Sequence, residues 1–240
     1  MFLVEGPQAV REALACAPDS VQELFFTGAS EDKHPDVLEL ARSAGVEIFP
    51  ATEEVLQAMS DTVTPQGILA VCSFIDVTLG EALSEGARNV AVLHEVKDPG
   101  NVGNIIRSAD AAGADAVILT EASVDVYNPK VVRATTGSLF HIPVVTGVSF
   151  IETLDALREA GLRAYATQAS GSDISELTAQ GELSAPTAWI FGNEAHGLSE
   201  DEAAQADARV AVPLYGQAES LSLQTAAALC LYQTAFAQRG

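Results

Sequence analysis

Apolar residues in the first 75 positions alternate between short runs and helical periods. Runs at 24–26, 46–49 and 68–72 predict β-strands, and periodic stretches at 6–15, 35–44 and 53–59 predict helices. Strands and helices that follow one another in this way are typical of a small α/β unit. We therefore assign residues 1–75 to one small domain.

Stronger strand signals follow a predicted linker at 76–88, which holds a short helical stretch at 80–85. The alternation of strands and helices over residues 89–240 predicts a second α/β domain, with a parallel sheet flanked by helices on both faces. Ligands of such sheets usually bind beyond the carboxyl ends of the strands. Its strands are predicted at 90–94, 116–119, 141–145, 163–166, 188–191 and 209–212, and its helices at 105–112, 129–136, 150–159, 200–205 and 223–238.

The last predicted helix is apolar on two sides. A helix of this kind is buried on both sides, by the chain's own core on one and by a second subunit on the other. A homodimer is therefore expected, with a deeper monomeric core as the alternative. One face holds Leu223, Ala226, Ala227, Cys230, Leu231 and Thr234, and the other holds Leu229, Tyr232 and Phe236.

Composition adds a constraint on partners. The chain has 33 acidic and 12 basic residues and a net charge of −21, which speaks against a strongly basic nucleic-acid binder but allows a local basic patch on an acidic coat. Cys16, Cys72 and Cys230 are far apart and odd in number, so neither a disulfide framework nor a metal site is expected. The chain shows no signal peptide and no long apolar run, so we expect a cytoplasmic protein.

The first loop with candidate functional residues is HEVKDPGNVGN at 94–104. Its Gly100 and Gly103 do not have the spacing of a dinucleotide or P-loop site, and Asp98-Pro99 predicts a turn. Arg107 then falls in the first turn of the next predicted helix, where a cation opposes the helix dipole. Its guanidinium can reach back over the loop to a substrate phosphate or hydroxyl, although a solvated surface arginine is an equal alternative.

Two further loops follow later strands. In WIFGNEAHGLS at 189–199, Gly192 lets backbone amides approach a flat ligand, and Glu194 can point into the site, whereas His196 is expected to have no catalytic duty. In VPLYGQAESLS at 212–222, Pro213 ends a strand and Ser222 can cap the last helix.

In this order and spacing, the loops resemble the three motifs of the SpoU-type RNA 2′-O-ribose methyltransferases of the SPOUT superfamily. The opening residues are similar to the small substrate-binding domain of many members, so the resemblance covers nearly the whole chain. The matching segments are VEGPQAVREAL at 4–14, TPQGILAV at 64–71, DPGNVGNIIRSADAAGADAVIL at 98–119, DVYNPKVVRATTGSLFHIPVV at 125–145, WIFGNEAHGLS at 189–199 and VPLYGQAESLSLQTAAALCLY at 212–232.

The resemblance implies a C-terminal trefoil knot, a homodimer and methyl transfer from S-adenosylmethionine to a ribose 2′-hydroxyl of RNA, with ribosomal RNA favoured over tRNA. By motif position, the backbone at Gly192, Val212 and Leu221 holds the cofactor. The reacting end takes Arg107 as the clamp for phosphate and hydroxyl, Glu194 as part of the polar network and candidate proton acceptor, and Asn101 as the orienting residue.

The third motif departs from the family at two positions. Members commonly carry Asn where this chain has Ser222, and relatives similar in the neighbouring text tend to carry Arg where Gln217 stands. Ser222 can act in catalysis through a water molecule. An inactive RNA-binding relative is therefore one alternative, and a nucleotide-binding enzyme with no RNA partner is another.

RNA binding by an acidic protein requires its few cations to be concentrated. We expect five of them to border one cleft, with one from the small domain and the others near the first motif. They are Arg11, Lys97, Arg107, Lys130 and Arg133.

Overall fold

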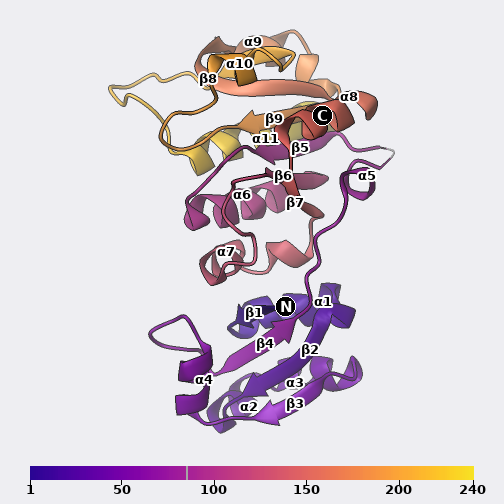
Figure 1. The fold of residues 1–240 in the computed structure, drawn as a ribbon, viewed down its shortest axis with the longest axis vertical. Helices are drawn as coiled ribbons and strands as arrows, with labels where there is room; N and C mark the ends of the chain where they lie inside the picture. The colour runs from indigo at the N-terminus through magenta and orange to yellow at the C-terminus, as the bar shows by residue number, and fades with distance from the viewer. Residues whose placement is uncertain (85) are drawn as a thin grey trace. The chain divides into compact units, whose positions relative to one another are not determined.

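A computed structural model describes residues 1–84 and 86–240 in two compact units (Figure 1). The first unit combines Met1–Ile75 with Val126–His141, and the second combines Asp76–Asp125 with Ile142–Gly240. Glu85, the last residue of the helical stretch predicted at 80–85, lies outside the described residues. None of the described helices is both long and apolar enough to cross a membrane.

The first unit is built on a mixed four-stranded sheet. The strand order is β1-β4-β2-β3, in which β2 and β3 are parallel and the other neighbours are antiparallel. The first of these strands was not predicted from the sequence. The bounds are β1 (Phe2–Glu5), β2 (Val21–Phe26), β3 (Glu47–Pro50) and β4 (Ile68–Cys72).

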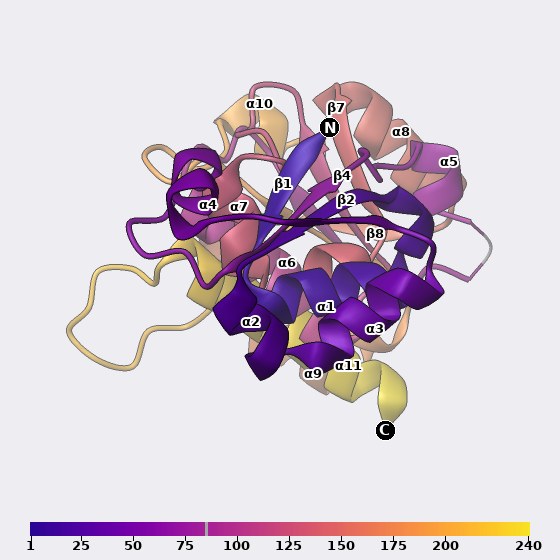
Figure 2. The same cartoon turned by 90° about the horizontal axis from the view of Figure 1, so that it is seen from below.

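Helices cover one face of this sheet, where α1 and α3 lie side by side (Figure 2). Each begins with a proline at its first position, where the fixed φ suits a helix and the missing N–H is not needed. The bounds are α1 (Pro7–Cys16), η1 (Pro18–Ser20), α2 (Gly28–Lys33), α3 (Pro35–Ser43) and α4 (Glu53–Met59).

The segment Val126–His141 packs with the first unit, although the sequence analysis placed it in the C-terminal domain. It contains α7 (Pro129–Thr135) and η2 (Ser138–Phe140), and α7 packs against β1. An aromatic cluster holds it there, since the ring of Phe2 lies 4.5 Å from Tyr127 and 6.2 Å from Phe140 between centroids. Sequence periodicity does not reveal contacts between residues so far apart in the chain.

The second unit confirms the predicted parallel sheet flanked by helices. Its six strands run in the order β10-β8-β9-β5-β6-β7, and every neighbouring pair is parallel. The seventh strand starts later than predicted because η2 and Pro143 precede it. The bounds are β5 (Asn89–Leu93), β6 (Ala116–Thr120), β7 (Val144–Val148), β8 (Arg163–Asp173), β9 (Thr187–Phe191) and β10 (Ala208–Ala211).

Helices cover both faces of this sheet. On one face α6 packs against α11, and the indole Nε1 of Trp189 donates to Thr234 Oγ1 at 2.8 Å. On the other face α5 and α8 close a core of aliphatic side chains that includes Ala82 and Leu83, two residues of the predicted linker. The bounds are α5 (Leu79–Ala82), α6 (Pro99–Ala112), α8 (Phe150–Glu159), α9 (Ile174–Ala179), η3 (Glu182–Ser184), α10 (Glu200–Ala203) and α11 (Leu223–Arg239).

The start of α6 corrects the sequence analysis. The helix begins at Pro99 rather than at residue 105, because Asp98 caps it by accepting a hydrogen bond from the Asn101 amide at 2.8 Å. Asp98-Pro99 is therefore a helix start rather than a turn, and Gly100 lies within the helix. Arg107 is more than two turns from the helix start, so the predicted conflict with the dipole was wrong.

Candidate active site

The carboxylate of Glu194 joins the loop after β9 to the start of α6. It accepts hydrogen bonds from the amides of Lys97 at 3.1 Å and Asp98 at 2.9 Å, and from the Asn101 side-chain amide at 3.1 Å. Desolvation alone would raise the pKa of Glu194, but these three donors outweigh it and hold the pKa below its usual value. Two of the predicted catalytic residues, Asn101 and Glu194, are thus in direct contact.

Backbone packing fixes the shape of the same loop. A Cβ added to Gly192 would lie 2.4 Å from the carbonyl carbon of Gly197 and 2.5 Å from the nitrogen of Leu198, so the chain can fold back only over a glycine. The Asn193 side chain donates to the carbonyl of Glu95 at 2.9 Å, and the Gly197 amide donates to the carbonyl of Asn193 at 2.8 Å. The loop is therefore held both to itself and to the end of β5.

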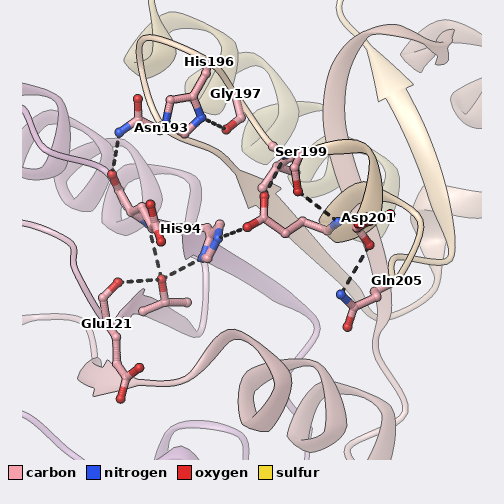
Figure 3. Close-up of polar contacts among 12 residues, drawn as sticks. His94, Glu121, Asn193, His196, Gly197, Ser199, Asp201 and Gln205 are labelled. Carbon is pink, nitrogen blue, oxygen red and sulfur yellow. Dashed lines mark hydrogen bonds and ion pairs between the residues drawn. The ribbon is translucent and has the colours of Figure 1, made fainter.

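A histidine that the sequence analysis left without a role lies at the end of β5. His94 is buried, with Nδ1 2.9 Å from Thr120 Oγ1 and Nε2 3.0 Å from Glu202 Oε1. Its ring centroid lies 4.3 Å from that of Phe150. Figure 3 shows His94 beside Ser199, the residue that caps the start of α10.

Glu202 continues this network into the second motif. Its carboxylate accepts from the Ser199 amide at 2.7 Å, as half of a reciprocal cap at the start of α10. Desolvation opposes ionisation here too, but the hydrogen bonds from Ser199 and His94 hold the pKa of Glu202 below its usual value. The network therefore ties the Ser199 end of the motif loop to the end of β5, and the sequence signal for it was the capping pattern at 199–202.

The loop of the third motif is exposed and, unlike that of the second, makes few hydrogen bonds with the rest of the described chain. Residues 214–220 are exposed, and residues 214–221 make no backbone–backbone hydrogen bond with any part of the chain that the structure describes. Val212 and Leu221 at its two ends are half-buried. Ser222 caps α11 by accepting from the Thr225 amide at 3.4 Å, as its sequence position predicts, and its Oγ lies 2.7 Å from Thr225 Oγ1.

A buried polar atom lies just beyond this cap. Gln224 Oε1 has no hydrogen-bond partner among the described residues. A buried acceptor without a partner is costly, so this oxygen calls for a donor that the described residues do not supply.

The predicted RNA-binding cations fall into two groups. Arg11, Lys130 and Arg133 belong to the first unit, whereas Lys97 and Arg107 belong to the second. That all five border one cleft stays a prediction.

Some of these cations are already engaged. Arg11 is paired with Asp36 at 2.7 Å, Arg133 with Glu5 at 3.4 Å, and the Lys97 ammonium donates to the carbonyl of Ala122. The other two, Arg107 and Lys130, are exposed, and their side chains have no partner among the described residues.

Comparisons with known families cover most of the chain. The model of the SpoU rRNA Methylase family matches residues 88–232, and the model described as RNA 2′-O ribose methyltransferase substrate binding matches residues 3–76.

Individual relatives agree with these matches. The chain is 38% identical to the 23S rRNA (guanosine(2553)-2′-O)-methyltransferase RlmP of Bacillus subtilis, over 96% of this chain and 87% of that protein. It is 30% identical to the 23S rRNA (guanosine-2′-O-)-methyltransferase RlmB of Bordetella pertussis, over 99% of this chain and 98% of that protein.

Solved structures show the same likeness. The SpoU methyltransferase AviRb from Streptomyces viridochromogenes superposes with a TM-score of 0.84 at 29% identity, covering 99% of this chain and 90% of that one. Its complex with the cofactor AdoMet gives a TM-score of 0.83 over the same shares.

Proposed function

Because the chain belongs to the SpoU rRNA methylase family, we propose that it transfers a methyl group from S-adenosylmethionine to a ribose 2′-hydroxyl of ribosomal RNA. The observation that carries the proposal is the contact of Glu194 with Asn101 and with the amides that open α6. It joins the first and second motifs at the carboxyl ends of β5 and β9, two adjacent strands, where a parallel sheet binds its ligands.

Polar groups without partners in the described chain support a cofactor site at the loop of the third motif. The backbone groups of residues 214–221 have no backbone partner in the described chain, and Gln224 Oε1 is a buried acceptor with no donor among the described residues. Gly192, Val212 and Leu221 would hold S-adenosylmethionine through their backbone groups, and the knot implied by the family would bring these loops together. When bound, the cofactor supplies a methyl group on a sulfonium, which is already a strong electrophile.

Glu194 and Asn101 serve as orienting groups in this proposal. A carboxylate that accepts three hydrogen bonds and has a lowered pKa is a weak base. We therefore favour Glu194 as the residue that holds the start of α6 and the Asn101 amide over its sequence-predicted part as proton acceptor.

Arg107 is free to meet the substrate. A guanidinium keeps its charge in a protein and offers a planar set of donors, so it suits a phosphate or a ribose oxygen better than it suits proton transfer. Its exposed side chain has no partner to give up among the described residues. Arg107 therefore clamps and orients the RNA, which places the 2′-oxygen for attack.

In the first unit, Lys130 is the predicted RNA-binding cation that is most available to a phosphate. This side chain is exposed and unpaired among the described residues, whereas Arg11 and Arg133 must loosen ion pairs with Asp36 and Glu5 before they bind a phosphate. Phosphate contacts by a few such cations are compatible with a strongly acidic surface.

A homodimer accounts for the exposed apolar face of α11. Leu229, Tyr232 and Phe236 are 47%, 37% and 67% exposed, while Cys230 and Leu231 on the other side are buried. Large side chains along one exposed helix face are typical of a subunit interface. Light scattering that reports a stable monomer at micromolar concentration would remove the dimer from the proposal.

Methyl transfer to 23S rRNA fragments tests the function. We expect labelled methyl groups from S-adenosylmethionine to appear as 2′-O-methylated nucleosides after digestion, and the Arg107→Ala variant to lose this activity while calorimetry still shows cofactor binding. RNA binding without cofactor binding would instead indicate the inactive relative. Cofactor binding without RNA binding would indicate an enzyme for another substrate.

A further inference from the structure

Three side chains of different ligand chemistry meet in the first unit. Glu12 and Cys16 lie four residues apart on α1, and His141 follows η2. One ligand atom from each lies within 4.8 Å of the other two, and His141 Nε2 is 3.2 Å from Glu12 Oε2. Residues four apart share a helix face, which accounts for the first pair.

We propose that Glu12, Cys16 and His141 form a binding site for a divalent metal ion of borderline softness, with Zn²⁺ as the ion of choice. Thiolate, imidazole and carboxylate are the ligands that zinc takes in proteins. Zn–N and Zn–O bonds of about 2.0–2.2 Å put neighbouring atoms of a tetrahedron about 3.4 Å apart. The His141–Glu12 distance already fits such an edge, and a water molecule completes the fourth position.

Neighbouring groups fix the carboxylate in the orientation that the site needs. Gln8 Nε2 donates to Glu12 Oε1 at 2.7 Å, so that Oε2 is the oxygen that faces His141. A Cβ at Gly137 would lie 2.5 Å from Cγ of Glu12, so the stem of Glu12 can take this place only beside a glycine. Outer-shell hydrogen bonds and packing of this kind orient metal ligands.

The site joins α1 to the segment Val126–His141, which carries Lys130. A bound ion would cross-link these two parts of the first unit and stabilise the arrangement that presents this lysine, because an ion that binds only the folded state shifts unfolding by mass action. No metal site was predicted from the sequence, because Cys16, Cys72 and Cys230 are far apart and odd in number.

Cobalt titration of the untagged, reduced, full-length chain tests the site. We expect one Co²⁺ per chain with a thiolate-to-cobalt charge-transfer band and tetrahedral d–d bands, both of which Zn²⁺ displaces. Cys16→Ser removes the charge-transfer band, and Cys16→His restores binding without it. His141→Ala and Glu12→Gln each weaken binding by about tenfold or more.

The chain offers matched controls. His34→Ala and Glu31→Gln change the same residue types in the same unit and leave the cobalt affinity unchanged. Burial raises the pKa of the Cys72 and Cys230 thiols to about 12, so neither competes as a thiolate ligand. Iodoacetamide should modify Cys16 rapidly, and Zn²⁺ should protect it.

Thermal unfolding gives a second readout. Zn²⁺ at about a hundred times its Kd should raise the Tm of the wild-type chain by about 5 °C and leave that of Cys16→Ser unchanged. Failure to bind one Co²⁺ per chain, or binding that survives both Cys16→Ser and His141→Ala, overturns the proposal. The methyltransferase proposal is unaffected by either result.

Discussion

The loops after β9 and β10 leave the same parallel sheet, yet they differ in how far the chain satisfies their polar groups. Residues 192–199 are held by the carboxylate of Glu194, by the Asn193 side chain and by a backbone hydrogen bond that closes the turn at Gly197. Residues 214–221 have no backbone–backbone hydrogen bond in the described chain and are mostly exposed.

The difference indicates that residues 192–199 act as a scaffold and residues 214–221 as a binding surface. Backbone donors and acceptors without partners in the protein must bind water or a ligand, whereas a satisfied loop is preorganised before any ligand arrives. We therefore expect substitutions in residues 192–199 to cost both stability and activity. Substitutions in 214–221 should act mainly on ligand binding.

The largest effect is expected at Gly192. Alanine there would press its Cβ to 2.4 Å from backbone atoms of Gly197, so the loop must move as a whole. Such overpacking costs about 1–3 kcal/mol, and a shift of the motif by about 1 Å lowers the methyl-transfer rate by about 100-fold.

Gly216 in the other loop provides the comparison, since a Cβ there meets nothing within 4 Å. Gly216→Ala should change the free energy of unfolding by less than about 0.5 kcal/mol. Urea unfolding of both variants measures the difference, and equal losses would show that the two loops are equally constrained.

Replacing Glu194 with glutamine should have the next largest effect. The amide keeps the shape but loses the charge that accepts three hydrogen bonds, so we expect about 1–3 kcal/mol less stability and about tenfold slower methyl transfer. Glu219→Gln, in the exposed loop, is the matched control and should leave stability unchanged. An unaltered transfer rate in Glu194→Gln would remove Glu194 from the proposed site.

The pH dependence of stability sharpens the same prediction. The folded pKa of Glu194 lies below the unfolded value near 4.5, so its charge stabilises the fold fully above pH 4.5 and less as the pH falls through the folded value. The gap between wild type and Glu194→Gln, measured by urea unfolding, should therefore narrow below pH 4.5. A gap that stays constant from pH 7 to pH 3 contradicts this assignment.

Local sequence patterns predicted part of the fold and of the site, whereas contacts between distant elements were missed. The parallel sheet followed from the alternation of apolar runs, and the cap at Ser222 followed from its place before a helix. The start of α6 was missed because Gly100 suggested a loop, while the cap at Asp98 and Pro99 decided otherwise. The contacts of His94 join distant elements, and no local pattern records them.

Substitutions of Ser222 should have a smaller effect, and they can distinguish a role in helix capping from a role in catalysis. Ser222→Ala removes the oxygen that accepts from Thr225 and should cost about 1 kcal/mol of stability. Asparagine caps a helix as well as serine does, and it is the residue that the resemblance to the family implies at this position. Ser222→Asn should therefore keep the stability and the methyl-transfer rate. A rate that falls in Ser222→Ala far beyond the loss of folded protein would assign Ser222 a direct part in the reaction.

The smallest effect concerns the cations of the first unit, where paired and unpaired groups can again be compared. Lys130 has no partner among the described residues, whereas Arg133 is held by Glu5. Desolvation would raise the pKa of Glu5, but hydrogen bonds from Ser60, Asp61 and Thr62 and the charge of Arg133 hold it low.

An unpaired ammonium can interact with a phosphate at no cost to another ion pair, whereas a paired guanidinium must first break its contact with the carboxylate. Lys130→Ala should therefore weaken RNA binding a few-fold and reduce the slope of log affinity against log salt by about 0.7 on single-stranded RNA. Arg133→Ala should change that slope less and instead lower the stability of the first unit, because it leaves the largely buried side chain of Glu5 without its cation. Filter binding over a salt series, with urea unfolding of the same samples, separates the two effects. A larger loss of salt slope in Arg133→Ala than in Lys130→Ala would mean that RNA displaces Glu5, and that pairing within the chain does not decide which cations bind.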